Sequence, residues 1–414
     1  MAVARALLGI SFFLAAAWLL SDHKRRFPVR VVVGGLALQL VLALFCIKTS
    51  VGVAFFEAIA QFVQRLIQMA QPGVAMVFGN LSEGNFAEGG WGFPFAFAAS
   101  GLPVIIFFSA LMAILYHLGV MQLLIYLLAQ VMTKLLGVSG AESMSMAANV
   151  FVGQTEAPLV VKPYIPGMTR SELNAMMTGG FATIAGSVLA VYLGLLGEQY
   201  GPHLITASVM SAPAAFLIAK IMVPETEVPA TGSNVELRVE RTASNVVEAA
   251  ANGTSDGVKL WLNVVAMLIA FMGLVAMADW FLGALREGLT LNTILSYLFA
   301  PVAWLMGVEG WHDCQHMGSL LGTKVAVNEF IAFEGLLSIN GATGEGAFDS
   351  ERTAIMASYA LCGFANFASV GIQIGGITPL APERRSTIAG FAVRAMLGGA
   401  FASWMTATVA GMFL

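Results

Sequence analysis

Apolar runs of about 20 residues recur along this chain, and they restrict its possible folds more than any other feature. Of its 414 residues, 58% are hydrophobic and only 11% are charged, and the mean hydropathy is +0.81. A soluble domain carries about 25% charged residues. The runs match helices that cross a hydrocarbon core about 30 Å thick. They are continuous rather than alternating, unlike membrane β-strands. We therefore predict an all-α integral membrane protein in a lipid bilayer.

The charged and sulfur-containing residues exclude other classes. The net charge is only -4 and no basic block is present, so we expect no nucleic-acid partner. Cys46, Cys314 and Cys362 are odd in number and lie in apolar sequence. They are predicted to be small core residues rather than a disulfide framework.

The hydropathy pattern predicts about eight transmembrane helices, at 5–21, 31–47, 102–118, 171–196, 203–222, 258–283, 352–378 and 386–412. Amphipathic segments at 51–70, 121–137 and 291–307 are predicted to lie in the membrane interface. The polar stretches 79–92 and 223–257 are interpreted as a glycine-rich segment and as a cytoplasmic loop or surface helix.

Basic residues predict the orientation. Lys24, Arg25 and Arg26 follow the first span and Arg384 and Arg385 precede the last, which places both segments in the cytoplasm. Both termini are then periplasmic. The first apolar run continues past an Ala-Ala-Ala sequence, so we interpret it as a retained span rather than a signal peptide.

Two polar stretches, Gly-Gln-Thr-Glu at 153–156 and Asn-Glu-Phe at 328–330, interrupt apolar sequence. A carboxylate at membrane depth costs roughly 2.5–3.5 kcal/mol, so Glu156 and Glu329 are functional-site candidates. Apolar pieces on either side are too short to span the bilayer. We predict two re-entrant hairpins, at 140–165 and 310–340, that enter from opposite sides; such irregular backbone requires cover from protein or water.

The sequence after each hairpin predicts an inverted repeat. The tripeptide Gly-Phe-Ala occurs at 180–182 and 363–365, and a polar residue, Thr183 or Asn366, follows at the same offset. A third copy at 390–392 follows no hairpin, so the tripeptide alone is weak evidence. In an inverted repeat the binding site is expected at the midplane, where the halves meet.

The polar groups indicate the ligand. Ionised Glu156 and Glu329 only accept hydrogen bonds, while amides and hydroxyls also donate. Such a set suits a neutral ligand rich in hydroxyls, such as a sugar diol, with Phe364 as an apolar face. Lys162 and Lys324 are the only nearby basic residues, which disfavours a phosphorylated ligand. Oxygen atoms at helix breaks, with Asn149 and Thr183, suit Na⁺.

Several segments together resemble the concentrative nucleoside transporter family. They are LPVIIFFSALMAILYHLGVMQ (102–122), GQTEAPLVVKPYI (153–165), GGFATIAGSVLAVYLG (179–194), GTKVAVNEFIAF (322–333), ALCGFANFASVGIQIGG (360–376) and APERR (381–385). The resemblance implies a homotrimer in the bacterial inner membrane that imports a nucleoside, such as uridine or adenosine, with Na⁺ by an elevator movement. Some relatives couple to protons, so H⁺ symport is the alternative.

The resemblance also implies residue roles. Gln154 and Thr155 would meet the base, with Gly153 and Val188 lining the pocket and Glu156 completing the hairpin tip. Glu329, Asn366 and Ser369 would hold the ribose, with Phe364 nearby. Na⁺ would be bound by Asn149, Thr183 and the carbonyls of Val152 and Ile184. The family often has serine where Thr183 stands, and threonine retains the hydroxyl.

The predicted organisation follows the repeats. Residues 1–120 form scaffold spans, 121–222 the first hairpin repeat, 223–290 a loop and scaffold span, 291–380 the second hairpin repeat and 381–414 the final span. The two hairpin repeats form the transport domain.

Other functions remain open at this point. Glu156 and Glu329 can instead be structural caps, and a passive channel is also compatible with the pattern. His312 and His316 are four residues apart and suggest an intramembrane metallohydrolase, because such a pair can bind zinc. The sequence offers neither a His-Glu-x-x-His motif nor an evident third ligand, so we predict a carrier and not an enzyme.

Overall fold

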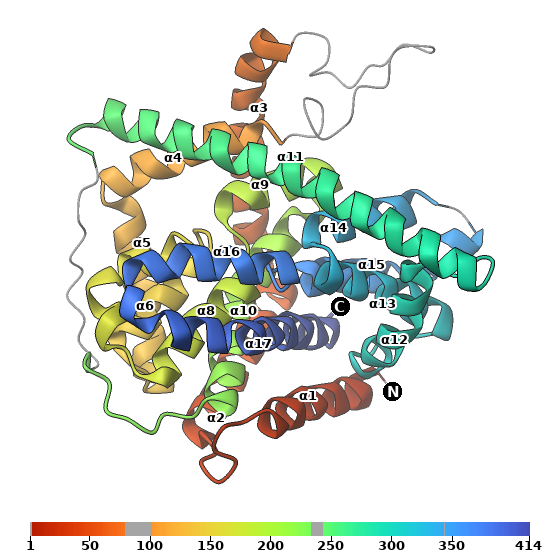
Figure 1. Cartoon of the computed structure of the whole chain (residues 1–414), viewed down its shortest axis with the longest axis horizontal. Helices are drawn as coiled ribbons and strands as arrows, with labels where there is room; N and C mark the ends of the chain where they lie inside the picture. The colour runs from red at the N-terminus through yellow and green to blue at the C-terminus, as the bar shows by residue number, and fades with distance from the viewer. Residues whose placement is uncertain (1, 79–101, 233–242, 343) are drawn as a thin grey trace.

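The regular secondary structure of the described residues is helical, which confirms the all-α prediction. The computed structural model describes residues 2–78, 102–232, 243–342 and 344–414 (Figure 1). By length and composition, six helices in this part can cross a membrane, or seven if one bent pair is counted as a span. The predicted glycine-rich segment at 79–92 lies outside the described residues.

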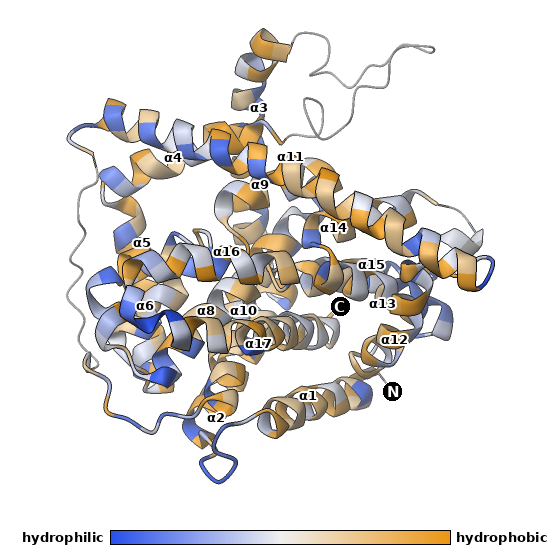
Figure 2. Ribbon diagram, in the orientation of Figure 1, coloured by the Kyte–Doolittle hydropathy of each residue, from blue (hydrophilic) through white to orange (hydrophobic). Residues whose placement is uncertain are grey.

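The first third of the chain supplies outer helices. They are α1 (Ala2–Leu19), α2 (Val29–Ala43, continued by a π-turn over Leu44–Lys48), α3 (Ser50–Phe78), α4 (Val104–His117) and α5 (Val120–Leu136). In Figure 2 the hydrophobic colour predominates along α1 and over much of α11 (Val246–Leu285). Both helices therefore present apolar surface of the kind that lipid covers.

Two similar groups of helices follow. The first has α6 (Gly140–Asn149), α7 (Ala157–Val160), α8 (Arg170–Ala182), α9 (Gly186–Leu196) and α10 (Gly201–Met222). The second has α12 (Leu291–Leu305), α13 (Trp311–Ala326), α14 (Glu329–Gly341), α15 (Glu351–Leu361), α16 (Phe367–Ile377) and α17 (Arg385–Gly411). Each group contains the predicted hairpin, then a broken helix, then a long helix. α10 and α17 pack together and against α8 and α15.

Local sequence explains where these helices begin. Ser139 and Thr169 each form a capping box, with Glu142 and Glu172 at the third helical position of α6 and α8. Asn328 caps α14 by accepting from the Ile331 amide at 2.9 Å. Asn366 caps α16 in the same way. Asn366, the polar residue predicted within the span at 352–378, therefore marks the start of a helix.

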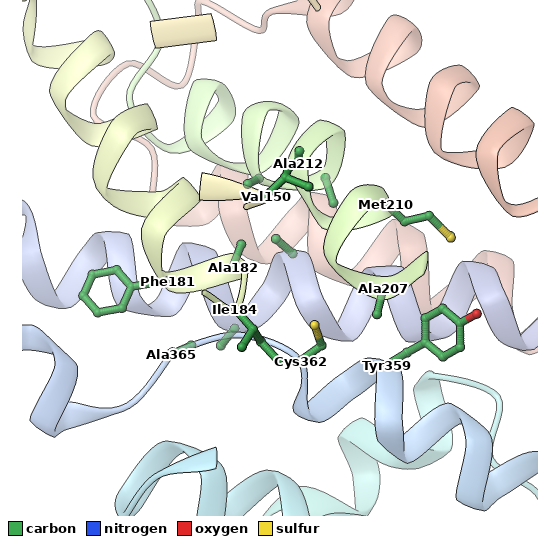
Figure 3. Packing of buried hydrophobic residues seen from close by; sticks show 14 of the residues in the cluster. Val150, Phe181, Ala182, Ile184, Ala207, Met210, Ala212, Tyr359, Cys362 and Ala365 are labelled. Carbon is green, nitrogen blue, oxygen red and sulfur yellow. The ribbon is translucent and has the colours of Figure 1, made fainter. Parts of the chain in front are cut away.

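The two helix breaks lie against each other. Gly363 has φ +123°, and a Cβ atom there would lie 2.8 Å from the carbonyl oxygens of both Phe181 and Ala182. Glycine is required by this backbone conformation and by the close approach. Figure 3 shows Ala182, Ile184, Cys362 and Ala365 gathered at this crossing. The two Gly-Phe-Ala tripeptides thus mark the place where the repeats meet.

Three elements differ from the sequence prediction. The helix expected in the interface at 51–70 is α3, which continues through Pro72 to Phe78 and is long enough to span. The span expected at 102–118 is α4, which has 14 residues and is bent by 76° from α5. α11 begins at Val246 rather than near 258 and has 40 residues, because Asn245 caps it within the polar stretch.

α11 extends along α4 at close range. Cβ atoms at Gly253 and Gly257 would lie 2.6 Å from the Ser109 carbonyl oxygen and 2.7 Å from the Ile106 Cα. This small-x-x-x-small spacing allows two helix backbones to approach closely. The part of α11 that was predicted to be a cytoplasmic loop or surface helix is therefore a helix that packs against α4.

The cysteines are as predicted. Cys46, Cys314 and Cys362 are free and buried, so they pack as small core residues.

Candidate functional site

Glu329 lies at the first position of α14, at the tip of the second hairpin. Its Oε1 accepts a hydrogen bond from the Tyr192 hydroxyl at 2.9 Å, and its Oε2 accepts one from Asn366 Nδ2 at 2.8 Å. The start of a helix favours a negative charge. An ionised carboxylate has about four lone-pair sites, so Glu329 retains acceptor capacity for a ligand.

Asn366 orients this carboxylate while capping a helix. Its Oδ1 accepts from the Ser369 amide at 2.7 Å, which leaves Nδ2 directed at Glu329. Asn366 and Ser369 are both buried. The structure therefore brings together the three residues that the resemblance assigned to the ribose.

Tyr192 is the residue that the sequence analysis missed. Its ring packs on Phe333 and Phe330, with centroids 4.5 Å and 6.3 Å away, and its hydroxyl reaches Glu329. The available signal was a tyrosine within the apolar run of α9, because a buried phenol needs a hydrogen-bond partner. The partner lies 137 residues away, so sequence spacing did not indicate it.

The tip of the first hairpin packs against the other repeat. A Cβ atom at Gly376 of α16 would lie 2.5 Å from Thr155 Cγ2. One at Gly180 would lie 2.6 Å from Gln373 Nε2 and 2.8 Å from Gln154 Cβ. Gln154 is buried, and its Oε1 has no hydrogen-bond partner among the described residues. That acceptor is suited to a ligand donor.

The two hairpins are thus arranged reciprocally. Thr155 of the first hairpin meets α16 of the second repeat, and Glu329 of the second hairpin meets α9 of the first repeat. This exchange explains how groups far apart in sequence face a common region.

Four further residues were predicted for the substrate site: Gly153, Glu156, Val188 and Phe364. A Cβ at Gly153 would lie 2.1 Å from Glu156 Oε2, so the glycine leaves room for that carboxylate to fold over the tip. Glu156 is exposed, Phe364 is half-buried and Val188 is buried. The described contacts do not connect these three side chains to Glu329.

A second group of oxygen atoms lies where α6 and α8 end. Asn149 is the last residue of α6, and its Nδ2 lies 3.2 Å from where a Cβ of Gly179 would be. Thr183 follows α8 and donates to the Gly179 carbonyl at 2.9 Å. Asn149 Oδ1 is buried with no partner in the described part of the chain. Two converging helix C-termini and a spare amide oxygen fit a cation.

Val152 and Ile184 belong to the same region. The Gly186 amide donates to the Phe151 carbonyl at 2.9 Å, which ties the segment after α6 to the break before α9. Val152 and Ile184 are buried beside these two residues. Their carbonyls therefore belong to backbone that the break leaves outside regular helix.

Lys324 is a buried cation near Glu329 in sequence. Its Nζ donates at 2.8 Å to both the Ala360 carbonyl and Ser403 Oγ. The carbonyl lies in the last turn of α15, where a helix favours positive charge. Lys324 therefore holds α13 against α15 and α17 rather than facing an anionic ligand.

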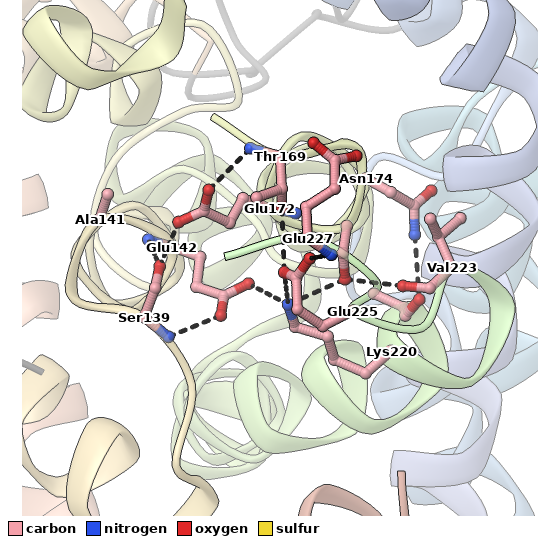
Figure 4. A network of polar contacts seen from close by, with 12 residues as sticks. Ser139, Ala141, Glu142, Thr169, Glu172, Asn174, Lys220, Val223, Glu225 and Glu227 are labelled. Carbon is pink, nitrogen blue, oxygen red and sulfur yellow. Dashed lines mark hydrogen bonds and ion pairs between the residues drawn. The ribbon is translucent and has the colours of Figure 1, made fainter. Parts of the chain in front are cut away.

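A polar network supports the base of the first hairpin (Figure 4). Lys220 Nζ of α10 lies 2.6 Å from Glu142 Oε2 and donates to Ser171 Oγ at 2.9 Å. Ser139 Oγ in turn donates to Glu172 Oε1 at 2.5 Å. A buried charge needs such partners. The network fixes α6, α8 and α10 to one another.

Three family models match the chain. Residues 203–411 match the C-terminal part and residues 8–81 the N-terminal part of the Na⁺-dependent nucleoside transporter family. Residues 99–199 match a nucleoside recognition model named Gate. Together the matches include both hairpins and both broken helices.

Similar curated proteins are transporters. The uncharacterised transporter YutK of Bacillus subtilis is 43% identical over 99% of this chain and 98% of its own length. Nucleoside permease NupC of Helicobacter pylori is 39% identical over 98% of this chain and 97% of its own. Sodium/nucleoside cotransporter 1 of Rattus norvegicus is 40% identical over 98% of this chain and 63% of its own.

Solved structures agree with these matches. CNTnw in an inward-facing substrate-bound state is 40% identical, with a TM-score of 0.91 over 100% of this chain and 98% of that one. A double variant of CNTnw in an outward-facing state gives a TM-score of 0.92 over 100% and 99%. The fold thus occurs in both states that alternating access requires.

The predicted class of protein is confirmed, and the metallohydrolase alternative has no support, since the matched families and relatives are transporters. The membrane location is confirmed as well. The facing hairpins, the crossed helix breaks and these matches lead to one conclusion: the chain belongs to the Na⁺-dependent nucleoside transporter family.

Proposed function

We propose that this protein imports nucleosides such as uridine or adenosine by symport with Na⁺. The observation that carries the proposal is Glu329, which is held by Tyr192 and Asn366 at the junction of the two repeats. A positioned carboxylate with free acceptor sites is suited to bind a pair of ribose hydroxyls.

The base would be bound by the first hairpin. Gln154 has a buried Oε1 without a partner among the described residues, and Thr155 packs on α16. An amide offers both donors and an acceptor, which match the edge of a nucleobase. Gly153, Glu156, Val188 and Phe364 would complete the pocket.

Na⁺ would bind at the ends of α6 and α8. Asn149 Oδ1, the Thr183 hydroxyl and the carbonyls of Val152 and Ile184 are the proposed ligands. The unpartnered Asn149 oxygen supports this assignment, since a buried polar atom ordinarily has a partner. The same hairpin carries Gln154, so ion binding and base binding can stabilise one conformation together.

The hairpins and broken helices are proposed to move as one body in an elevator-type cycle. Reciprocal packing of Thr155 on α16 and Glu329 on α9 supports a rigid unit. The remaining spans would form the scaffold of a homotrimer in the bacterial inner membrane, with both termini in the periplasm.

Counterflow in proteoliposomes tests this function. We expect labelled uridine or adenosine to accumulate in Na⁺ and to lose accumulation in choline at either of two pH values. Accumulation in choline that rises at the lower pH would instead establish H⁺ coupling. Flux that never exceeds equilibration would indicate a channel.

A further inference from the structure

Two histidines and two aspartates come together where α13 begins. His312, Asp313 and His316 lie in the first turns of α13, and Asp349 lies in the segment between α14 and α15. Possible ligand atoms of His312, Asp313 and Asp349 lie within 4.8 Å of one another. The fold therefore places the carboxylates of Asp313 and Asp349 beside His312, and the sequence spacing did not reveal the contribution of Asp349.

The distances fit a shared metal ion. His312 Nδ1 lies 3.4 Å from Asp349 Oδ2 and 3.6 Å from Asp313 Oδ1. Ligand atoms around a tetrahedral zinc ion, each about 2.0–2.1 Å from the metal, are about 3.3 Å apart. Small side-chain adjustments would bring all three atoms into one coordination sphere, with water as a fourth ligand.

His316 orients the central histidine. Its Nε2 lies 3.1 Å from Nε2 of His312, which is hydrogen-bonding distance. When His312 carries its proton on Nε2, its Nδ1 lone pair faces the two carboxylates. Metal-ligating histidines commonly donate their other N–H to such a partner, which fixes the tautomer and the ring orientation.

Asp313 provides an independent indication of a ligand. Its side chain is fully buried, and its Oδ1 accepts from the Asp349 amide at 2.7 Å. Its Oδ2 is buried with no hydrogen-bond partner in the part of the chain that the structure describes. A buried carboxylate oxygen without a partner is costly, and an ion bound by both oxygens of Asp313 would satisfy it. The Asp349 carboxylate is 70% exposed, which gives an ion a path from solvent.

We propose that His312, Asp313 and Asp349 bind a divalent transition-metal ion of the Zn²⁺ type, with His316 as the positioning residue. The ion would connect the first arm of the second hairpin to the segment that leads into α15. Its role would be to stabilise the base of that hairpin, and it does not depend on the proposed transport cycle.

Zinc titration of purified, tag-free protein tests the proposal. After treatment with a chelator, we expect the protein to bind one Zn²⁺ per protomer, measured by competition with a fluorescent chelator, and its melting temperature to rise. Co²⁺ should give the visible absorption of a tetrahedral site. Asp349→Asn and His312→Ala should abolish both effects, and His316→Ala should weaken binding roughly 10- to 100-fold.

Two control variants test whether zinc binds at this site rather than at other exposed histidines or carboxylates. His23→Ala and Asp256→Asn alter exposed residues elsewhere and should bind zinc like the wild type. Because Asp349 is exposed, its asparagine variant is expected to fold, which a single size-exclusion peak and a cooperative melting transition can verify. Wild-type protein without stoichiometric zinc would overturn the proposal. So would Asp349→Asn with normal affinity, which would place any ion between the two histidine Nε2 atoms instead.

Discussion

Glu329 illustrates how one side chain obtains its role from residues distant in sequence. Tyr192 and Asn366 approach it from α9 and from the start of α16, and each occupies one carboxylate oxygen. The carboxylate is therefore oriented before any ligand arrives, and preorganised groups lose less entropy on binding.

Replacing this carboxylate should weaken nucleoside binding. In Glu329→Gln a ribose hydroxyl would lose a charged acceptor, which is worth about 1.5–3 kcal/mol, or roughly 10- to 150-fold in affinity. Isothermal titration calorimetry of the purified variant with uridine or adenosine measures this loss of affinity. Glu334→Gln changes an exposed carboxylate of the same helix and should have no effect. Wild-type affinity in Glu329→Gln would refute the ribose assignment.

Tyr192→Phe should show a smaller loss in the same titration. The variant retains the ring that packs on Phe333 but removes the hydroxyl that donates to Glu329. We expect about tenfold weaker binding, since one hydrogen bond to a charged group is lost. Tyr126→Phe, at an exposed position, is the matched control. Equal affinities of the two variants would show that Tyr192 does not position the carboxylate.

Asn149→Ala should change the dependence on sodium. The substitution removes the unpartnered Oδ1 at the end of α6, so the proposed Na⁺ site would lose a ligand. We expect a several-fold higher Na⁺ concentration for half-maximal uptake, with protein expression little changed. Uptake with the wild-type sodium dependence would place the ion elsewhere.

The helices show why some elements are predictable and others are not. Both hairpins were predictable, since a polar stretch in apolar sequence is a local signal. The Gly-Phe-Ala tripeptide marked the two helices that are broken, but the span at 171–196 was predicted as one helix and is divided into α8 and α9. The length of α3 was not, because Pro72 is accommodated within the helix. Nor was the start of α11, where Asn245 caps a helix inside polar sequence. Tyr192 and Asp349 depend on tertiary contacts that no local pattern encodes.

Gly363, at the crossed breaks, should be sensitive to substitution. In Gly363→Ala a Cβ would lie 2.8 Å from two carbonyl oxygens at a φ of +123°, a strain of about 1–3 kcal/mol. We expect a lower melting temperature and reduced uptake. Gly390→Ala, in the third copy of the tripeptide, meets open space within α17 and should be neutral or slightly stabilising. If the two variants had the same melting temperature and the same uptake, the close contact between the two helix breaks would be contradicted.

Across the whole molecule, the hairpins and broken helices form one connected body. The first hairpin carries both the proposed Na⁺ ligand Asn149 and the proposed base ligand Gln154, and Thr155 packs against α16 of the second repeat. An ion that orders the first hairpin would therefore also order the nucleoside site. Such coupling between two ligands must be reciprocal.

The coupling predicts that Na⁺ and nucleoside stabilise the protein more together than separately. We expect uridine or adenosine to raise the melting temperature of detergent-purified protein more in NaCl than in choline chloride, because each ligand stabilises the folded state in which the other binds. In Asn149→Ala the two salts should give nearly the same nucleoside-induced shift. In Glu329→Gln the nucleoside-induced shift should be small in both salts. Equal shifts of the wild type in NaCl and choline chloride would show that the sites are not coupled, and the symport proposal would then fail even if nucleoside binding persisted.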